Sequence, residues 1–536
     1  MLADHGVTTV FGLPGVHNLP LWDVADGPRI IGVRHEQAAG YAADGLARSG
    51  GGLGVAITTT GPGAMNVLAS FGEAAVSHSS ILVIASDVSS ALRRAEPRGI
   101  LHEMRDQAAP FAPLASRDAD GRPMAHTGRD ADDVVATLGA FLAHHRQHGE
   151  VAAYLGIPTD LLAAPCDLVP TPVAAGDGDT WPDLAPAVHA IDAMQRPALW
   201  LGGGAAAVCD RPGGADLLHA FVDRLQAPVL TTFAGRGVLA GHPLVVDAPV
   251  HEPEGHAVLA AADGLVVLGS DVDGMNSRNW RMPLPPVQVS INHALEPVRT
   301  NLPDALHIHA DLGILATLTQ QVAAHAPWSD PSSTADAMRA RLRADPRGTN
   351  GIRLVEAIEV AWPAHAALVV DMCVAGYWLA GYARQPRPRR LAYPVGWGTL
   401  GFALPAALGS ASRGIPTLAV TGDGGLMFAL GELATIAQER LPITLLIHDD
   451  GGYGMLRYDQ QVFGHPERGV DLTAPEWHQL AAAFGIEAVD ADLDSLQGAL
   501  LWGRTRNRRG QPAIVVTRMP LHPPRTTSPR WGEPMA

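Results

Sequence analysis

Two acidic residues follow two short apolar runs in the last third of the chain, in a pattern suited to binding a metal and a phosphate. Asp423 comes directly after residues 416–422, and Asp450, 27 positions later, ends residues 443–450. Between them, residues 426–440 carry helix-forming residues with apolar side chains at helical spacing. This order predicts a strand, a glycine turn, a helix and a second strand, which together form one parallel crossover unit.

Such a crossover unit would place both carboxylates at the same edge of one parallel sheet. The glycine turn before the helix would add free N–H groups and the positive end of the helix dipole, which attract a phosphate. Hard divalent cations bind carboxylate and phosphate oxygens together, so the pattern predicts a metal-bridged phosphate site. Two solvated loop acids are the alternative, but the strand and helix pattern around them favours the site.

The same residues resemble a known motif. The run 422–425, followed by an acid and then by residues 452–454, is similar to the thiamine diphosphate motif of the 2-oxo-acid decarboxylase and acetolactate synthase superfamily. The resemblance implies that Mg²⁺ is bound by Asp423, Asp450 and the backbone carbonyl of Gly452. The family usually has Asn as the second ligand. Asp450 keeps an oxygen donor but adds a negative charge, which leaves the preferred metal and its affinity open.

The resemblance extends over nearly the whole chain, and its segments follow the order of the family. They are residues 10–15, 34–39, 61–66, 156–160, 196–204, 231–237 and 398–407. The cofactor-binding residues that the resemblance implies are Gly398, Leu400, Gly422, Asp423, Gly424, Gly425, Gly452, Tyr453 and Asn66. Leu400 matches a bulky apolar side chain that holds the cofactor in a bent shape, although ordinary core packing requires the same type of residue.

Glu36 is the candidate catalytic residue. It follows an expected strand at residues 30–34 and begins an expected helix, where a carboxylate also favours the helix N-terminus without any catalytic role. The segment 34–39 resembles the family segment whose Glu hydrogen-bonds the aminopyrimidine ring of thiamine. The resemblance implies that Glu36 promotes the imino form of this ring, which then removes the proton from the thiazolium carbon.

The residues that would contact the substrate are less well defined by the sequence. The resemblance suggests His78, Gln107 and Met455 as substrate neighbours, and each has an alternative role in helix capping, solvation or packing. The pair His144-His145 lies too far downstream to match the paired histidines of pyruvate-type decarboxylases. That mismatch favours carboligation over simple aldehyde release.

Composition limits the classes of function. A net charge of −16 argues against binding nucleic acid or an anionic membrane, and no apolar run reaches the ~18–20 residues that span a bilayer. The chain contains no lysine, which excludes the usual Schiff-base, pyridoxal phosphate and Walker-type enzymes. Three scattered cysteines and the lack of a signal-like start predict a cytoplasmic protein.

A chain of 536 residues predicts about three domains. We expect three doubly wound parallel-sheet α/β domains: residues 1–165 bind the pyrimidine, residues 184–320 form a central Rossmann-like domain, and residues 351–519 bind the diphosphate. We expect a linker at 165–181, a polar connection at 329–349 and an unstructured tail after Pro520. Residues 202–204 lack the full dinucleotide-binding spacing, so FAD in the central domain is compatible with the family but unsupported by a motif.

The expected function is thiamine diphosphate- and Mg²⁺-dependent decarboxylation of a 2-oxo acid, followed by carboligation to a second carbonyl, as in acetolactate synthases. The alternatives are a decarboxylase that releases an aldehyde, as benzoylformate decarboxylase does, and a non-catalytic subunit that binds the cofactor as a scaffold. In the family the cofactor bridges the first domain of one subunit and the third domain of another. The resemblance therefore implies a homodimer or homotetramer.

Overall fold

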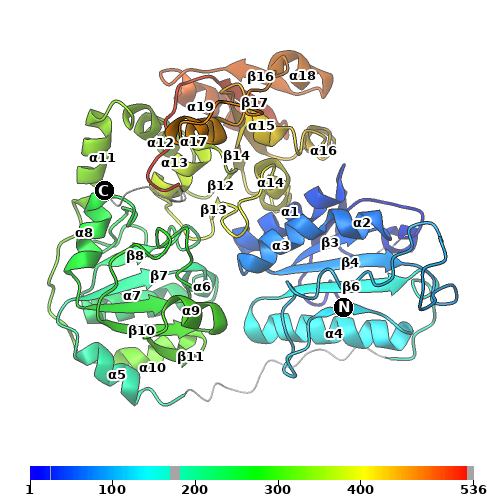
Figure 1. Ribbon diagram of the computed structural model, residues 1–536, viewed down its shortest axis with the longest axis horizontal. Coiled ribbons are helices and arrows are strands. Elements are labelled where there is room, and N and C mark those ends of the chain that lie inside the picture. Colours follow the sequence, from blue (N-terminus) through cyan, green and yellow to red (C-terminus); the bar gives the residue numbers. More distant parts are fainter. Residues whose placement is uncertain (24–25, 169–181, 528–536) are drawn as a thin grey trace.

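The computed structural model describes residues 1–23, 26–168 and 182–527, which form three α/β domains, each built on one parallel sheet (Figure 1). This confirms the predicted fold class. Strands such as β4 and β15 are buried along their whole length, because helices cover both faces of each sheet. Their nearly continuous apolar runs follow from that burial. None of the helices in the described part of the chain combines the length and apolarity needed to cross a membrane.

The first domain has the strand order β2-β1-β3-β4-β6-β5. Its strands are β1 Thr9–Gly12, β2 Arg29–Gly32, β3 Gly54–Thr58, β4 Ile81–Asp87, β5 Ala125–Thr127 and β6 Ala152–Pro158. Its helices are α1 Glu36–Leu46, α2 Pro62–Asn66, α3 Leu68–Val76 and α4 Ala131–His148, with short helical turns at Leu19–Trp22 and Ala47–Gly51. The pair His144-His145 lies in α4, as expected from its helix-like surroundings.

The central domain has the strand order β11-β10-β9-β7-β8. Its strands are β7 Pro197–Leu201, β8 Val229–Thr231, β9 Gly264–Leu268, β10 Val287–Asn292 and β11 Leu306–His309. Its helices are α5 Ala185–Asp192, α6 Gly203–Val208, α7 Gly214–Leu225, α8 Pro253–Ala261, α9 Glu296–Asn301 and α10 Leu315–Gln321, with a helical turn at Leu312–Ile314. A Cβ atom on Gly202 would lie 2.1 Å from the carbonyl oxygen of Gly269, so this glycine serves the close packing of two loops.

The third domain has the strand order β13-β12-β14-β15-β17-β16. Its strands are β12 Ala367–Val370, β13 Leu391–Ala392, β14 Thr417–Gly422, β15 Ile443–His448, β16 Glu487–Asp490 and β17 Ala513–Thr517. Its helices are α12 Thr349–Ala361, α13 Val374–Tyr382, α14 Ala403–Ser412, α15 Asp423–Leu426, α16 Glu432–Gln438, α17 Gly454–Val462, α18 Trp477–Ala483 and α19 Leu496–Asn507.

Two connections differ from the sequence-based expectation. The polar stretch 329–349 contains helix α11, Thr334–Ala344, whose Arg341 pairs with Glu252 and Glu254 of the central domain. The expected helix at 426–440 is shortened to α16, and the short helix α15 precedes it, because hydrogen bonds to the third residue back replace the α-helical pattern between them. Residues 169–181 of the expected linker lie outside the described residues.

The first and third domains share one hydrophobic core in which α1 packs on α14. Glycines allow this close approach: a Cβ atom on Gly45 would lie 2.0 Å from the carbonyl oxygen of Ala406, and one on Gly409 would lie 2.1 Å from that of Ala42. The helix that begins at Glu36 is therefore fixed against the third domain.

Candidate active site

The carboxyl ends of β14 and β15 bring the two predicted acids to one edge of the sheet. The strands pair in parallel with Gly422 opposite His448, so Asp423 and Asp450 follow neighbouring strand ends. Asp423 is buried, and neither of its carboxylate oxygens has a hydrogen-bond partner among the residues that the structure describes. A buried carboxylate without partners is costly, so this position fits a ligand for a divalent cation.

The electrostatics of the two carboxylates also fit a cation. Burial raises the pKa of Asp423 to about 6, and the nearby Asp450 carboxylate adds to this increase. Burial likewise raises the pKa of Asp450, while the positive charge of Arg457 opposes it. A shared divalent cation would stabilise the charged form of both carboxylates.

Arg457, on α17, holds the loop that carries the second acid. Its guanidinium donates hydrogen bonds to the backbone carbonyls of Asp450, at 3.1 Å, and of Gly451, at 3.0 Å. It also pairs with the Asp471 carboxylate at 2.9 Å. Sequence reasoning missed this residue, because its partners become neighbours only when the loop folds back on α17.

Glycines shape both loops of the site. A Cβ atom on Gly424 would lie 2.7 Å from the ring of Tyr453, so the two motifs pack directly on each other. Gly452 has a φ of +151°, and a Cβ atom there would lie 1.9 Å from the carbonyl oxygen of Val470. The glycines at these two motif positions are therefore required by packing and backbone conformation.

Residues 398–400, which include the predicted Gly398 and Leu400, lie between β13 and α14. Gly398 has a φ of +69°, which favours glycine. The two residues that follow residues 398–400 are held by the buried Asp371. Its carboxylate accepts hydrogen bonds from the backbone N–H of Gly401, at 3.0 Å, and of Phe402, at 3.4 Å. Burial raises the pKa of Asp371 to about 6 even though these hydrogen bonds lower it.

Glu36 begins α1 and is buried. The Asn66 side chain, at the end of α2, donates a hydrogen bond of 3.0 Å to one of its carboxylate oxygens. Gly63 leaves room beside the other oxygen, since a Cβ atom there would lie 3.3 Å from it. The two predicted residues Glu36 and Asn66 thus form one unit in the first domain.

The predicted substrate neighbours lie in different environments. Gln107 is buried and bonds the backbone N–H of Gly61, the carbonyl of Ser86 and the Tyr154 hydroxyl. Its polar atoms stabilise the turn before α2, and a contact between Gln107 and the substrate stays a prediction. Met455 is the second residue of α17, close after the loop that carries Asp450 and Gly452, and it is half-buried against a hydrophobic core that the central and third domains share.

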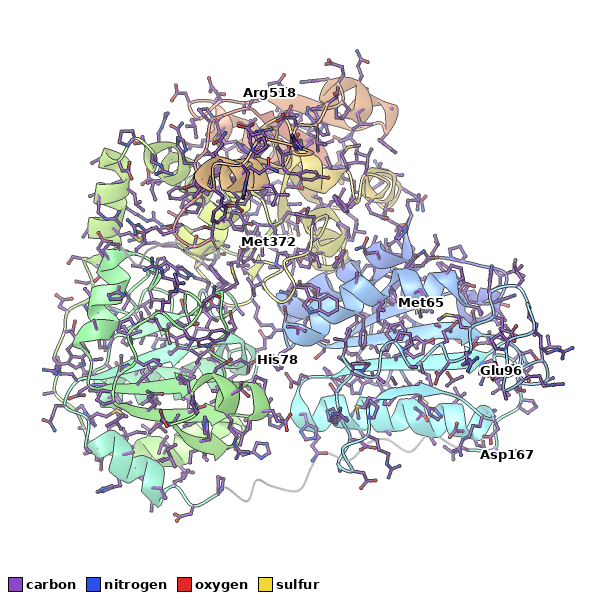
Figure 2. The ribbon with its side chains drawn as sticks, viewed as in Figure 1. Met65, His78, Glu96, Asp167, Met372 and Arg518 are labelled. Atoms are coloured by element: carbon purple, nitrogen blue, oxygen red, sulfur yellow. The ribbon has the colours of Figure 1, made fainter. Side chains whose placement is uncertain are left out.

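His78 lies between the first and central domains (Figure 2), where it contacts the carboxylates of Glu150, at 3.2 Å, and Asp271, at 2.6 Å. His78 lines a cavity of about 310 Å³, and Gly204 and Gly396 also line it. Asp423 is not among the residues that line this cavity. Within one chain, His78 therefore joins two domains and does not approach the loop that carries Asp450 and Gly452.

The catalytic and metal-binding candidates remain apart within the described part of the chain. No hydrogen bond or ion pair there joins Glu36 or Asn66 to Asp423, to Asp450 or to residues 398–400. Each half of the site is formed, one in the first domain and one in the third. A complete site requires the two halves to meet.

Family models match each of the three domains. Residues 1–109 match the N-terminal TPP (thiamine pyrophosphate, also called thiamine diphosphate) binding domain of thiamine pyrophosphate enzymes. Residues 184–320 match their central domain, and residues 371–516 match their C-terminal TPP binding domain.

Individual relatives and a solved structure match along nearly the whole chain. A probable 2-ketoarginine decarboxylase of Pseudomonas aeruginosa is 33% identical, over 94% of this chain and 90% of that protein. The acetolactate synthase large subunit of Lactococcus lactis is 27% identical, over 92% and 87%, and isozyme 2 of Escherichia coli is 26% identical, over 92% and 91%. A proposed thiamin diphosphate-dependent enzyme from Mycobacterium smegmatis has the same fold, with a TM-score of 0.76, 22% identity and coverage of 96% and 97%.

Proposed function

Because this chain belongs to the thiamine pyrophosphate enzyme family, we propose that it decarboxylates a 2-oxo acid with thiamine diphosphate and Mg²⁺. The observation that carries this proposal is the buried Asp423. Its two carboxylate oxygens have no hydrogen-bond partner in the described part of the chain, and it lies beside the strand end that leads to Asp450. Such a carboxylate is unfavourable unless a cation shares its charge.

Different residues would bind different parts of the cofactor. Asp423, Asp450 and the Gly452 carbonyl would bind Mg²⁺, and the turn 422–425 would bind the diphosphate. Residues 398–400 would support the aminopyrimidine ring. When bound, thiamine diphosphate supplies a carbon nucleophile and accepts the electrons that remain when CO₂ leaves.

Glu36 would act on the proton of the aminopyrimidine ring nitrogen. Asn66 bonds one of its carboxylate oxygens, which fixes the orientation of the carboxyl group. The other oxygen has room beside Gly63, so it would be free to bond the ring nitrogen and to hold a proton there. A scaffold subunit would not need this residue, so its presence supports an active enzyme.

We propose that the active form is at least a dimer, in which Glu36 of one subunit meets Asp423 of another. Three large apolar side chains are exposed around residues 398–400, here called the cofactor loop. Trp397 is 47% exposed, Met427 49% and Phe428 55%. A Cβ atom on Gly401 would lie 2.5 Å from the Cβ of Phe428, so this cluster borders residues 398–400. A second copy that brings its Glu36 to this edge would cover the cluster.

Mixing two inactive variants tests this arrangement. Dimers of Glu36→Gln alone and of Asp423→Ala alone are expected to be inactive. Unfolding and refolding them together forms hybrids in which one of the two sites has both natural residues, so about half of the wild-type activity per hybrid is expected, measured as CO₂ release. Hybrids without activity would show that Glu36 and Asp423 serve the site within one subunit.

The decarboxylated product can be released as an aldehyde or joined to a second carbonyl. The relative with 33% identity is named a decarboxylase, whereas the acetolactate synthases reported above are 26–27% identical. This difference favours aldehyde release, and it places carboligation, the first expectation from the sequence, as the second candidate. The name of the same relative also suggests a 2-oxo acid with a guanidino side chain.

Product analysis distinguishes these functions. The protein is incubated with thiamine diphosphate, Mg²⁺ and 2-oxo acids bearing guanidino, aliphatic or aromatic side chains, each alone and with an acceptor aldehyde. We expect CO₂ and an equimolar aldehyde from one of the acids. A coupled hydroxyketone, or acetolactate from pyruvate, would identify the carboligase. Absence of CO₂ from every acid, with the cofactor bound, would contradict the proposed decarboxylation.

A further inference from the structure

Two buried carboxylates hold the cofactor loop from its two ends. Before residues 398–400, Glu73 of α3 accepts hydrogen bonds from the backbone N–H of Gly396, at 3.1 Å, and of Trp397, at 2.8 Å. After them, Asp371 accepts the two hydrogen bonds from Gly401 and Phe402. The three residues in between are those expected to contact the aminopyrimidine ring. Their position is therefore set by one carboxylate from each of two domains.

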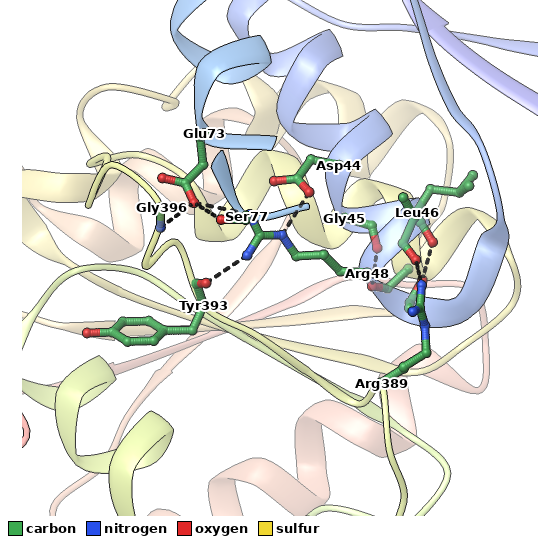
Figure 3. Close-up of polar contacts among 12 residues, drawn as sticks. Asp44, Gly45, Leu46, Arg48, Glu73, Ser77, Arg389, Tyr393 and Gly396 are labelled. Carbon is green, nitrogen blue, oxygen red and sulfur yellow. Dashed lines mark hydrogen bonds and ion pairs between the residues drawn. The ribbon is translucent and has the colours of Figure 1, made fainter. Parts of the chain in front are cut away.

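Glu73 is fully buried, and its charge is balanced by a network between the domains (Figure 3). The Arg48 guanidinium donates to the Glu73 carboxylate at 3.1 Å and to the Asp44 carboxylate at 2.7 Å. It also donates to the backbone carbonyl of Tyr393, at 2.8 Å, near the start of the same loop. Two buried carboxylates thus share one guanidinium, and the backbone N–H groups of the loop provide the remaining stabilisation of Glu73.

The residues around Glu73 also pack closely against the loop. A Cβ atom on Gly72 would lie 2.1 Å from the ring of Trp397, so the loop rests directly on α3. The Ser77 hydroxyl donates a hydrogen bond of 3.0 Å to the Glu73 oxygen that also accepts from Gly396, and it makes no hydrogen bond to the loop among the described residues. These contacts restrict the orientation of the carboxylate that accepts both loop N–H groups.

The segment that carries Glu73 also supports the catalytic acid. Helices α2 and α3 are consecutive, and Asn66 at the end of α2 bonds Glu36, while Glu73 lies about two turns further on. In the proposed dimer, Glu36 and the loop of the same chain serve different active sites. The α2–α3 segment then lies between the two sites and touches a functional element of each.

We propose that Glu73 is a positioning residue, which acts from the first domain to set the cofactor loop of residues 398–400. It touches neither the substrate nor the reacting atoms, and its effect passes through the backbone of Gly396 and Trp397. This inference rests on the proposed use of thiamine diphosphate.

The variant Glu73→Gln tests the inference. Its amide keeps one acceptor oxygen but places an NH₂ group against donors, so it loses at least one of the two loop hydrogen bonds. We expect the dissociation constant of thiamine diphosphate at saturating Mg²⁺ to rise about 10- to 100-fold, since charge-assisted hydrogen bonds are lost. We also expect faster hydrogen–deuterium exchange in a peptide that covers residues 394–402, with little change elsewhere.

Two further variants serve as controls. Ser77→Ala removes a partner of Glu73 but leaves both loop hydrogen bonds, so cofactor affinity and exchange should stay near wild type. Glu73→Asp keeps the charge but shortens the side chain by one methylene, and its cofactor affinity should also fall. If Glu73→Gln does not fold, Glu73→Asp decides the question.

The outcomes separate this inference from the proposed function. Unchanged cofactor affinity in a folded Glu73 variant, or faster exchange throughout the protein, would overturn the positioning role alone. Wild-type protein that fails to bind thiamine diphosphate in the presence of Mg²⁺ would overturn the proposed function and this inference together.

Discussion

Glu36→Gln is expected to lower kcat/KM more than ~100-fold, because a positioned acid–base group typically contributes about 10²- to 10⁴-fold. The amide cannot supply a proton to the aminopyrimidine ring nitrogen as a carboxyl group does. Cofactor affinity should change little, because the metal and diphosphate contacts come from the third domain. Steady-state decarboxylation and Mg²⁺-dependent cofactor binding, measured on the same preparation, check both parts.

Asn66→Ala provides a graded comparison for Glu36→Gln. It removes the 3.0 Å hydrogen bond to Glu36 but leaves the carboxyl group in place, so a smaller loss of about tenfold is expected. Full turnover by Glu36→Gln would show that the proposed mechanism is wrong. Loss of cofactor binding in that variant would instead assign Glu36 a role in holding the cofactor.

Asp423→Ala is expected to abolish Mg²⁺-dependent binding of thiamine diphosphate. The two oxygens of Asp423 are buried and have no hydrogen-bond partner among the described residues, so a shared cation would stabilise their charge. Without the cofactor, the melting temperature of the variant should equal or exceed that of wild type, because a buried carboxylate without partners is removed. Adding Mg²⁺ and thiamine diphosphate should stabilise wild type but not the variant.

Asp449→Asn is the comparison variant, because Asp449 precedes Asp450 directly but its carboxylate bonds the Trp477 indole, at 2.9 Å, and Arg518, at 3.0 Å. Its other oxygen accepts a hydrogen bond from the backbone N–H of Gly451, at 3.3 Å, and the side-chain oxygen of an asparagine can keep that bond. This variant should have a lower melting temperature, yet it should still be stabilised by Mg²⁺ and thiamine diphosphate. Unchanged cofactor affinity in Asp423→Ala would contradict the metal assignment. A large loss of stability without cofactor would show that Asp423 has an unidentified structural partner.

Residue patterns within short segments specified the local parts of both half-sites. Glycine spacing and apolar runs predicted the strands that end at Gly422 and His448, because a buried parallel strand and a tight turn each restrict residue type within a few positions. The same local pattern placed Glu36 at the start of α1. The carboxyl edge of the third-domain sheet could therefore be assigned before any tertiary contact was known.

Tertiary structure decided what depends on distant residues. Glu73 reaches a loop 323 positions away, and no local pattern encodes that contact. The three hydrogen-bond partners of the Gln107 side chain are likewise brought together only by the folded domain. The expected helix at 426–440 breaks, and Gly431 in the break packs against Arg34 of the first domain. Local chemistry thus specified the reactive groups, whereas packing between domains specified how they are held, since burial and long-range hydrogen bonds depend on the whole fold.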